Sequence, residues 1–241
     1  MESRATNATG DSMVISIRST QHEVFEPTIM NMHNLRYRVF IRRLGWDITC
    51  FHSSIYGFLE QDEYDLEDPV YLIATDVDGA VVGCARLIPC TRMCMIDNTF
   101  AAIKGGFEPE DRNRALEASR FAVDTQRSTR LNKSKMITRT AAELLKAMVE
   151  YGLHNGYEQV VFITDARFEK ILRFCGLSVE RIGSDGSHQS VSTVAGRFPT
   201  DHQQLQRIAR TCGLWEPSLC APVIPGEALR EGEQDVKAAV V

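Results

Sequence analysis

The chain has 241 residues, of which 44% are apolar and 24% charged, a composition typical of a single globular domain with a sizeable core. Its formal net charge of −5 argues against general attraction to nucleic acid. No apolar run approaches the roughly 20 residues of a membrane span, and the polar start lacks the apolar segment of a signal peptide, so we expect a cytoplasmic protein.

The cysteines and histidines point away from disulfides and metals. Seven cysteines form an odd set without a C-x-x-C pair, which argues against both a disulfide framework and a zinc site. Six scattered histidines show no metal-binding spacing. We therefore expect reduced thiols and no metal.

The first part of the chain predicts one strand and one helix. Residues 1–13 form a polar lead, 14–215 a single domain, and 216–241, rich in proline, glycine and charge, a flexible tail. Residues 14–18 alternate as a strand, and a helical pattern runs from Glu26 to a closing glycine at Gly45. Residues 47–61 lack periodicity and predict a loop. The acidic run 60–68 is, on composition alone, a solvated loop.

The rest of the chain predicts alternating strands and helices. Two apolar runs, 70–74 and 80–88, flank an Asp78-Gly79 turn and predict a hairpin. After a loop at 90–116 we expect strands at 117–124, 159–164, 178–182 and 190–197, and helices at 140–155, 166–174 and 201–211. This order favours an α/β fold, a three-layer αβα sandwich with a mixed central sheet.

The strand at 117–124 carries two opposite charges among apolar neighbours. Period-2 alternation places Glu117, Ser119 and Phe121 on one face and Arg120 on the other. Charges on both faces fit the wall of a polar cleft, because buried charges need partners. An edge strand with two solvated side chains is the alternative, and these residues alone leave it open.

Four motifs follow one another along the chain: Arg36-x-x-x-Phe40-x-x-Arg43-Leu44-Gly45-Trp46, Asp62-x-Tyr64-Asp65, Gly83-x-x-Arg86-Leu87-Ile88-Pro89 and Glu117-x-Ser119-Arg120-Phe121. Together they resemble the acyl-homoserine-lactone synthases of the LuxI type. The resemblance implies a fold like the GNAT acyltransferases, with a V-shaped split between two parallel strands. It also implies condensation of S-adenosylmethionine with a fatty acyl thioester, which yields an acyl-homoserine lactone, the carrier thiol and methylthioadenosine.

The resemblance also implies the site residues. Its charged set falls on Arg36, Asp62, Asp65, Arg86, Glu117 and Arg120, and its aromatic set on Phe40, Trp46 and Phe121. Three arginines and three carboxylates would give every buried charge a partner. No histidine lies in the motifs, so Glu117 is the expected base, acting through a water, with Arg86 and Arg120 beside it. S-adenosylmethionine is a substrate, and no cofactor is expected.

For the acyl chain, the resemblance implies a pocket along the strand at 160–164, lined by Phe100, Phe121, Phe162 and Ile163. Ordinary core packing is the alternative for all four. Cys90 and Met93 stand where the family often has threonine and proline, and Leu116 stands before the glutamate where members often differ. These departures leave the reaction intact and the acyl chain undetermined.

The resemblance implies an acyl donor carried on acyl carrier protein or coenzyme A, and a basic run could bind either. Its members are Arg127, Arg130, Lys133, Lys135 and Arg139, with Lys170 and Arg173 on the next helix. A solvated loop and helix start is the alternative. A GNAT N-acyltransferase that uses acetyl-CoA stays open, although residues 127–140 lack the glycine of a pyrophosphate loop. A non-catalytic binding module would leave the balanced charges unexplained.

Overall fold

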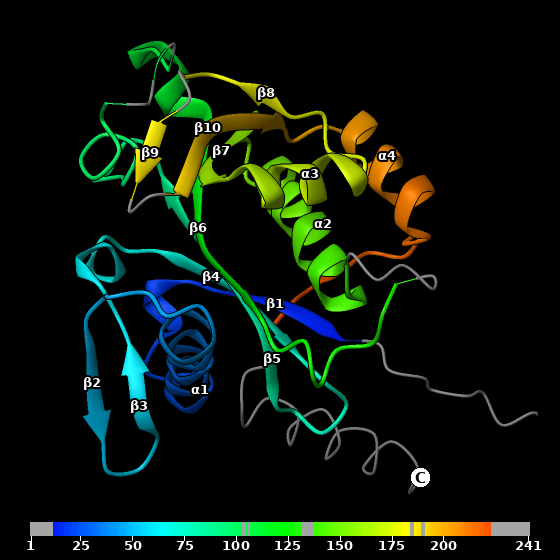
Figure 1. Cartoon of the computed structure of the whole chain (residues 1–241). Coiled ribbons are helices and arrows are strands. Elements are labelled where there is room, and N and C mark those ends of the chain that lie inside the picture. Colours follow the sequence, from blue (N-terminus) through cyan, green and yellow to red (C-terminus); the bar gives the residue numbers. More distant parts are fainter. Residues whose placement is uncertain are drawn as a thin grey trace, which may run out of the picture.

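A nine-stranded sheet divides the molecule into layers (Figure 1). The computed structural model describes residues 12–102, 105, 107–131, 137–183, 186–188 and 191–222. The strand order is β11-β1-β4-β5-β6-β7-β10-β8, and β9 pairs with β10. In chain order the strands are β1 (Met13–Ile17), β4 (Val70–Thr75), β5 (Val81–Pro89), β6 (Ala115–Val123), β7 (Gln159–Asp165), β8 (Glu180–Arg181), β9 (Gly186–His188), β10 (Val191–Pro199) and β11 (Leu219–Cys220).

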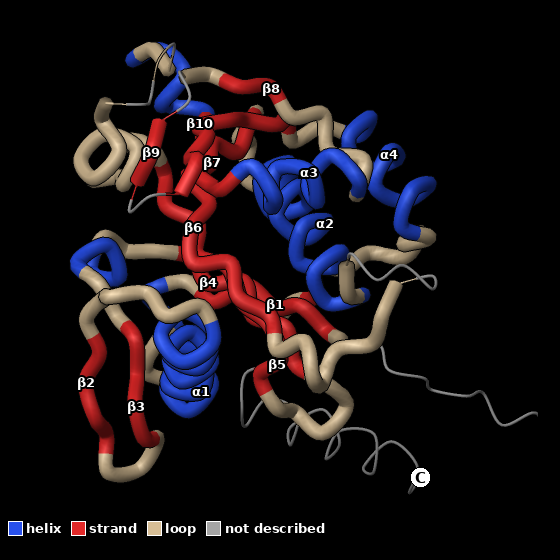
Figure 2. The backbone as a smooth tube through the Cα atoms, in the orientation of Figure 1, coloured by secondary structure: helices blue, strands red, loops and turns tan. Residues whose placement is uncertain are grey.

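Helices cover both faces of this sheet (Figure 2). On one face lies α1 (Glu26–Arg36), which continues as a π-helix over Tyr37–Arg43. On the other lie α2 (Arg139–His154), α3 (Ala166–Phe174) and α4 (His202–Cys212). The expected three-layer α/β sandwich with a mixed sheet is confirmed. None of the helices in the described part of the chain is long and apolar enough to cross a membrane.

The sequence explains where the helices begin and end. The side chains of Thr138, Asp165 and Asp201 accept backbone N–H groups at the starts of α2, α3 and α4. Gly213 ends α4 in the left-handed conformation that glycine adopts most readily. The apolar stripe of α2 packs on the sheet within one large core that includes Leu72, Leu87 and Val160. These are the helices that the periodicity predicts.

The sheet splits between its two central parallel strands. β6 and β7 pair from Ala115 opposite Gln159 to Ala118 opposite Phe162. Beyond Ala118, β6 continues beside β5 alone, while β7 continues beside β10. The V-shaped split that the resemblance implies therefore opens just after Ala118.

Three parts of the secondary structure differ from the expectation. Residues 47–61 contain a hairpin, β2 (Cys50–Ser53) and β3 (Gly57–Glu60), outside the main sheet. No residue of β2 is buried, and the two buried residues of β3, Leu59 and Glu60, are adjacent, so the hairpin has no alternation for the sequence to reveal. β9 is an unexpected short strand on β10. β11 lies in the expected tail but pairs with β1, because Glu150 binds the N–H groups of Ser218 and Leu219.

Candidate active site

A buried ionic cluster lies on the face of the sheet that α1 covers. Arg36 is at its centre and is fully buried. Its Nε donates to Glu60 Oε2 at 2.5 Å, and its Nη1 and Nη2 donate to Asp65 Oδ1 and Oδ2 at 2.8 Å each. Such a planar two-bond contact is the strong form of an arginine–carboxylate pair. Each of the three nitrogens of the Arg36 guanidinium therefore donates a hydrogen bond to a carboxylate.

Arg86, from β5, is the second buried arginine of the cluster. It donates to both oxygens of Asp62 and to Ser119 Oγ at 3.0 Å, and its Nη1 lies 3.0 Å from Asp65 Oδ1. Asp65 thus faces two arginines, and Tyr71 Oη also donates to it at 2.9 Å. Desolvation opposes ionisation of Asp65, but Arg36 and Arg86 outweigh it and hold the pKa of this carboxyl well below its usual range.

Arg120 forms the accessible rim of the cluster. Its Nε donates to Glu60 Oε1 at 3.0 Å, and its Nη2 lies 2.6 Å from Asp62 Oδ2. The side chains of Arg120 and Asp62 are 10% and 11% exposed, whereas those of Arg36 and Arg86 are 0% exposed. A ligand can therefore touch Arg120 and Asp62 but not the two inner arginines.

A bulge in β6 places Arg120 in this cluster, and the expected strict alternation is wrong. Arg120 has φ of 50°, in the left-handed region that non-glycine residues rarely adopt. The register with β5 shifts between Cys84 and Arg86, which face Ala122 and Ser119. The extra residue turns Arg120 to the face of Glu117 and Ser119. β6 is also an inner strand, so the edge-strand alternative is excluded.

The third carboxylate of the ion-pair network is Glu60, in the acidic run that composition alone places in a solvated loop. It is 0% exposed and bridges Arg36 and Arg120. No sequence signal separates it from the neighbouring acidic residues 63 and 67. Tyr71 and His33, whose Nδ1 lies 2.8 Å from the Glu60 carbonyl, were also missed because neither belongs to a motif.

Glu117 lies outside this network, in a pocket of backbone N–H groups. It is 2% exposed, and its two oxygens accept from the N–H groups of Met95, at 3.0 Å, and Ile96, at 2.7 Å. Burial raises the pKa of Glu117, while these two N–H groups and the charge of Arg86 oppose the rise. The carboxylate is therefore fixed in orientation one residue before the last β6–β7 pair.

The expected aromatic residues divide between the two faces of the sheet. The rings of Phe40 and Trp46 stack at 4.8 Å, and the Arg120 guanidinium lies 5.7 Å from the Phe40 ring. Trp46 is 42% exposed, so the stack is open to solvent on the Trp46 side. Phe121 instead points to the opposite face and packs on Phe168 of α3, with ring centroids 5.1 Å apart. It is therefore not part of the cluster.

The four expected acyl-pocket residues do not form one group. Phe121 and Phe162 pack with the core on the α2 side, where Phe162 lies 5.8 Å from the ring of Phe198. Ile163 packs on the other face, with the cluster that contains Ile88 and Ile96. Phe100 is half-buried in the segment before β6, and its N–H donates to the Met95 carbonyl.

The expected docking residues differ in how free their charges are. Arg127 pairs with Asp76, Arg139 with Glu143 and Arg173 with Glu169. Arg130 and Lys170 are exposed and have no ionic partner among the described residues. Lys133 and Lys135 lie outside the described residues. In the described part of the chain, no group of histidine, cysteine and acidic residues is arranged to hold a metal ion.

Comparison with known proteins gives this geometry a family. A family model described as autoinducer synthase matches residues 20–208. The chain belongs to the autoinducer synthase family. An acyl-homoserine-lactone synthase of Agrobacterium fabrum is 32% identical over 195 residues, which are 81% of this chain and 90% of that protein. One of Vibrio anguillarum is 31% identical over 182 residues, 75% of this chain and 90% of that protein.

Solved structures agree on the fold of this autoinducer synthase. The AHL synthase LasI superposes with a TM-score of 0.67 at 26% identity, over 83% of this chain and 94% of that one. The CoA-dependent synthase BjaI, solved with SAM and isopentyl-CoA, gives a TM-score of 0.72 at 22% identity over 92% and 99%. A putative N-acetyltransferase of Lactobacillus plantarum, at 12% identity and a TM-score of 0.51, shares the fold alone, over 78% and 99%. The GNAT-like fold is confirmed, and the protein is an acyltransferase.

Proposed function

We propose that this autoinducer synthase joins the acyl group of an acyl thioester to the α-amine of S-adenosylmethionine and closes the product to an acyl-homoserine lactone, releasing methylthioadenosine. The position of Glu117 carries the proposal. Its carboxylate is buried, fixed by two N–H groups, and one residue from the point where β6 and β7 part. The reacting atoms would meet at that split.

Glu117 is the proposed base. A free α-amine has a pKa near 8, so much of it is protonated at pH 7 and cannot attack. A carboxylate whose pKa burial has raised is a better proton acceptor than an ordinary one. A water between amine and Glu117 would carry the proton. The amine nitrogen then bonds to the thioester carbonyl carbon, and the carrier thiol leaves.

Backbone N–H groups of β6 are proposed to stabilise the oxyanion formed in that step. Beyond Ala118, β6 has no β7 neighbour, so its N–H groups on that side have no ladder partner in β7. In the second step the carboxylate of the acylated substrate attacks its own γ-carbon and displaces the sulfonium. Because both groups belong to one molecule, the protein needs mainly to hold the folded conformer.

Arg120 and Asp62 are the proposed ligands of the polar end of S-adenosylmethionine. They are the accessible members of the cluster, and they can pair with a carboxylate and an ammonium respectively. The exposed face of the Phe40–Trp46 stack suits the adenine or the sulfonium. Arg36, Arg86 and Asp65, which belong to the charged set that the resemblance implies, are proposed to hold Arg120 and Asp62 in place.

The donor's carrier is proposed to dock beside α3 and the loop after β6. Arg130 and Lys170 are exposed there and have no ionic partner among the described residues. The acidic acyl carrier protein would meet a local positive face, and coenzyme A would use the same charges for its phosphates. Action in the cytoplasm stays a prediction.

The test is incubation of the purified protein with S-adenosylmethionine and a panel of acyl-ACP and acyl-CoA donors, with products identified by mass spectrometry. We expect an acyl-homoserine lactone and an equal amount of methylthioadenosine. An acylated amine other than the lactone would indicate a GNAT N-acyltransferase. No product from any donor would contradict the proposal.

A further inference from the structure

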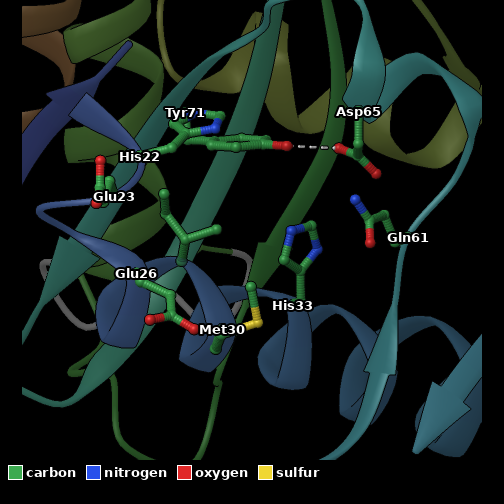
Figure 3. A pocket seen from close by; sticks show the side chains of 9 residues that line it. His22, Glu23, Glu26, Met30, His33, Gln61, Asp65 and Tyr71 are labelled. Atoms are coloured by element: carbon green, nitrogen blue, oxygen red, sulfur yellow. Dashed lines mark hydrogen bonds between the residues drawn. The ribbon is translucent and has the colours of Figure 1, made fainter. Parts of the chain in front are cut away.

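A cavity of about 330 Å³ lies behind the ionic cluster, between α1, residue 61 and β4. Figure 3 shows its side chains, among them Tyr71, whose hydroxyl donates to Asp65, and His33, which rises from α1. Asp65 is part of the cavity wall, and Arg36 binds both Asp65 and Glu60. The cavity wall therefore contains residues that contact the ionic cluster.

The hydrogen bond of His33 has a defined direction. Its Nδ1 lies 2.8 Å from the backbone oxygen of Glu60, and a carbonyl oxygen can only accept. Burial, reinforced by the charge of Arg36, lowers the pKa of His33 to about 4, so the ring is neutral at pH 7. The single ring proton must then lie on Nδ1, which donates to Glu60. The ring is held edge-on against Tyr71, 5.9 Å away.

His33 and Arg36 hold the same residue at two points. They lie three residues apart on α1 and so face the same way. His33 binds the backbone of Glu60, and Arg36 binds its carboxylate. The other carboxylate oxygen of Glu60 accepts from Arg120. One turn of α1 thus holds Glu60 in place, and Glu60 in turn holds Arg120.

Glu60 needs this support because of where it lies. It is the last residue of β3, in a two-stranded hairpin that has no ladder bond to the main sheet. α1 ties the hairpin through three backbone oxygens, those of Tyr56 and Phe58 through Asn34 Nδ2, and that of Glu60 through His33. Only the last of these ties holds the residue that bears the carboxylate.

We infer that His33 is a positioning residue, which sets the place of the Arg120 guanidinium through Glu60 and thereby the affinity for S-adenosylmethionine. The inference rests on the proposed role of Arg120 in binding that substrate. His33 itself lies on the far side of Glu60 and does not touch the rim. Its removal should therefore act on substrate binding more than on the chemical step.

Two substitutions separate the hydrogen bond from the bulk of the ring. In His33→Asn the amide nitrogen takes the place of Nδ1 and can still donate to Glu60. His33→Leu fills a similar volume without a donor. Asn34→Ala is the matched control, because it frees the hairpin at Tyr56 and Phe58 and leaves Glu60 bound. Each variant is measured for its S-adenosylmethionine Kd by calorimetry, for KM and kcat, and for Tm.

We expect His33→Leu to raise Kd and KM for S-adenosylmethionine roughly tenfold, the effect of one lost buried hydrogen bond, with a smaller change in kcat. His33→Asn should stay within about twofold of wild type, although its packing against Tyr71 is poorer and its Tm falls. Asn34→Ala should lower Tm and leave Kd unchanged. If His33 had only a structural role, affinity and Tm would fall together. Near-wild-type affinity in His33→Asn at a lowered Tm would therefore indicate a positioning role.

The inference is overturned if His33→Leu binds S-adenosylmethionine as wild type does, if His33→Asn is as weak as His33→Leu, or if Asn34→Ala weakens binding equally. Should His33→Leu fail to fold, His33→Gln replaces it, because its amide reaches the position of Nε2 rather than Nδ1. Lactone formation by the wild-type protein, measured in the same assay, decides the proposed function separately from the ratio of variant affinities.

Discussion

At Glu117, burial and hydrogen bonding act on the same carboxylate in opposite directions. Desolvation favours the protonated form, and the N–H groups of Met95 and Ile96 favour the ionised one. The two N–H groups also fix both oxygens, so the carboxylate cannot rotate to follow a substrate. The substrate amine must therefore be brought to Glu117 at the split. Arg120 and Asp62 at the rim of the cluster are proposed to place it there.

Glu117→Gln should lower kcat by about 10²-fold or more and leave the Kd for S-adenosylmethionine unchanged, because the amide has a similar shape but cannot take a proton. Its NH2 group must face the N–H of Met95 or Ile96, so Tm should also fall. Steady-state kinetics and calorimetry measure the two quantities. Glu63→Gln, at an exposed carboxylate, is the control. Undiminished turnover at saturating substrates would remove Glu117 from the reaction.

His33 should make the folded protein less stable as the pH falls. Its pKa is lowered from 6.5 to about 4 on folding, so between these values the unfolded chain binds more protons than the native one. The free energy of unfolding should therefore fall as the pH drops from 6.5 to 4, by about 3 kcal/mol from this group. Urea unfolding at several pH values measures the slope.

The matched variant for that experiment is His33→Asn, which has no titrating ring. Its free energy of unfolding should change less steeply over the same pH range than that of wild type. Equal slopes in the two proteins would contradict the lowered pKa of His33.

The sequence alone does not show which of the three arginines a substrate can reach. Arg36, Arg86 and Arg120 are equivalent members of motifs in the sequence, and only their burial separates two inner residues from one at the rim. Glu60 was missed for the same reason, because its partners lie on α1 and β6. The sequence predicts which charges are present, and the fold decides which of them a substrate can reach.

At the scale of elements, strong periodicity predicted α2, α3, α4 and the strands β4 to β7. The sequence did not predict the hairpin β2–β3 or the bulge in β6, and the two omissions have the same cause. The hairpin β2–β3 is held by contacts with α1 and with the π-helix that continues it, such as the stack of Tyr37 on Phe58, rather than by an alternating buried face of its own. The bulge at Arg120 depends on Glu60 and Asp62, which hold the side chain on that face. Both depend on residues far away in the sequence.

The split between β6 and β7 makes different predictions for Phe121 and Phe162. Phe121 lies beyond the last β6–β7 pair and is partly exposed, whereas Phe162 is 5% exposed in the core. Phe121→Ala should shift donor preference toward longer acyl chains, since each added buried methylene contributes about 0.8 kcal/mol. Phe162→Ala should instead lower stability by about 3 kcal/mol or more.

A donor panel and thermal unfolding measure the two effects, and each variant is the control for the other. An unchanged product distribution in Phe121→Ala would return that residue to the core. A shifted distribution in Phe162→Ala at unchanged stability would assign it to the acyl pocket, as the family resemblance suggested.

At the scale of the whole molecule, an enzyme with a net charge of −5 must attract an acidic carrier through a local surface. Reversing Arg130 and Lys170 to Glu should raise KM for acyl-ACP and flatten its dependence on salt, with little change in kcat. Arg210→Glu, exposed on α4, is the control. Wild-type salt dependence in the double variant would place carrier docking elsewhere.

The pairing of β11 with β1 determines how far the C-terminus can be truncated without exposing a strand edge. Glu150 is buried and takes its hydrogen bonds from Ser218 and Leu219, while Lys146 donates to the Glu216 carbonyl at 2.5 Å. A chain ending at residue 215 would lack these partners and would leave one side of β1 with unpaired backbone groups. Such an open strand is a template for aggregation. We expect the shortened protein to form soluble oligomers or precipitate, measurable by light scattering, whereas a chain ending at residue 222 should stay dispersed.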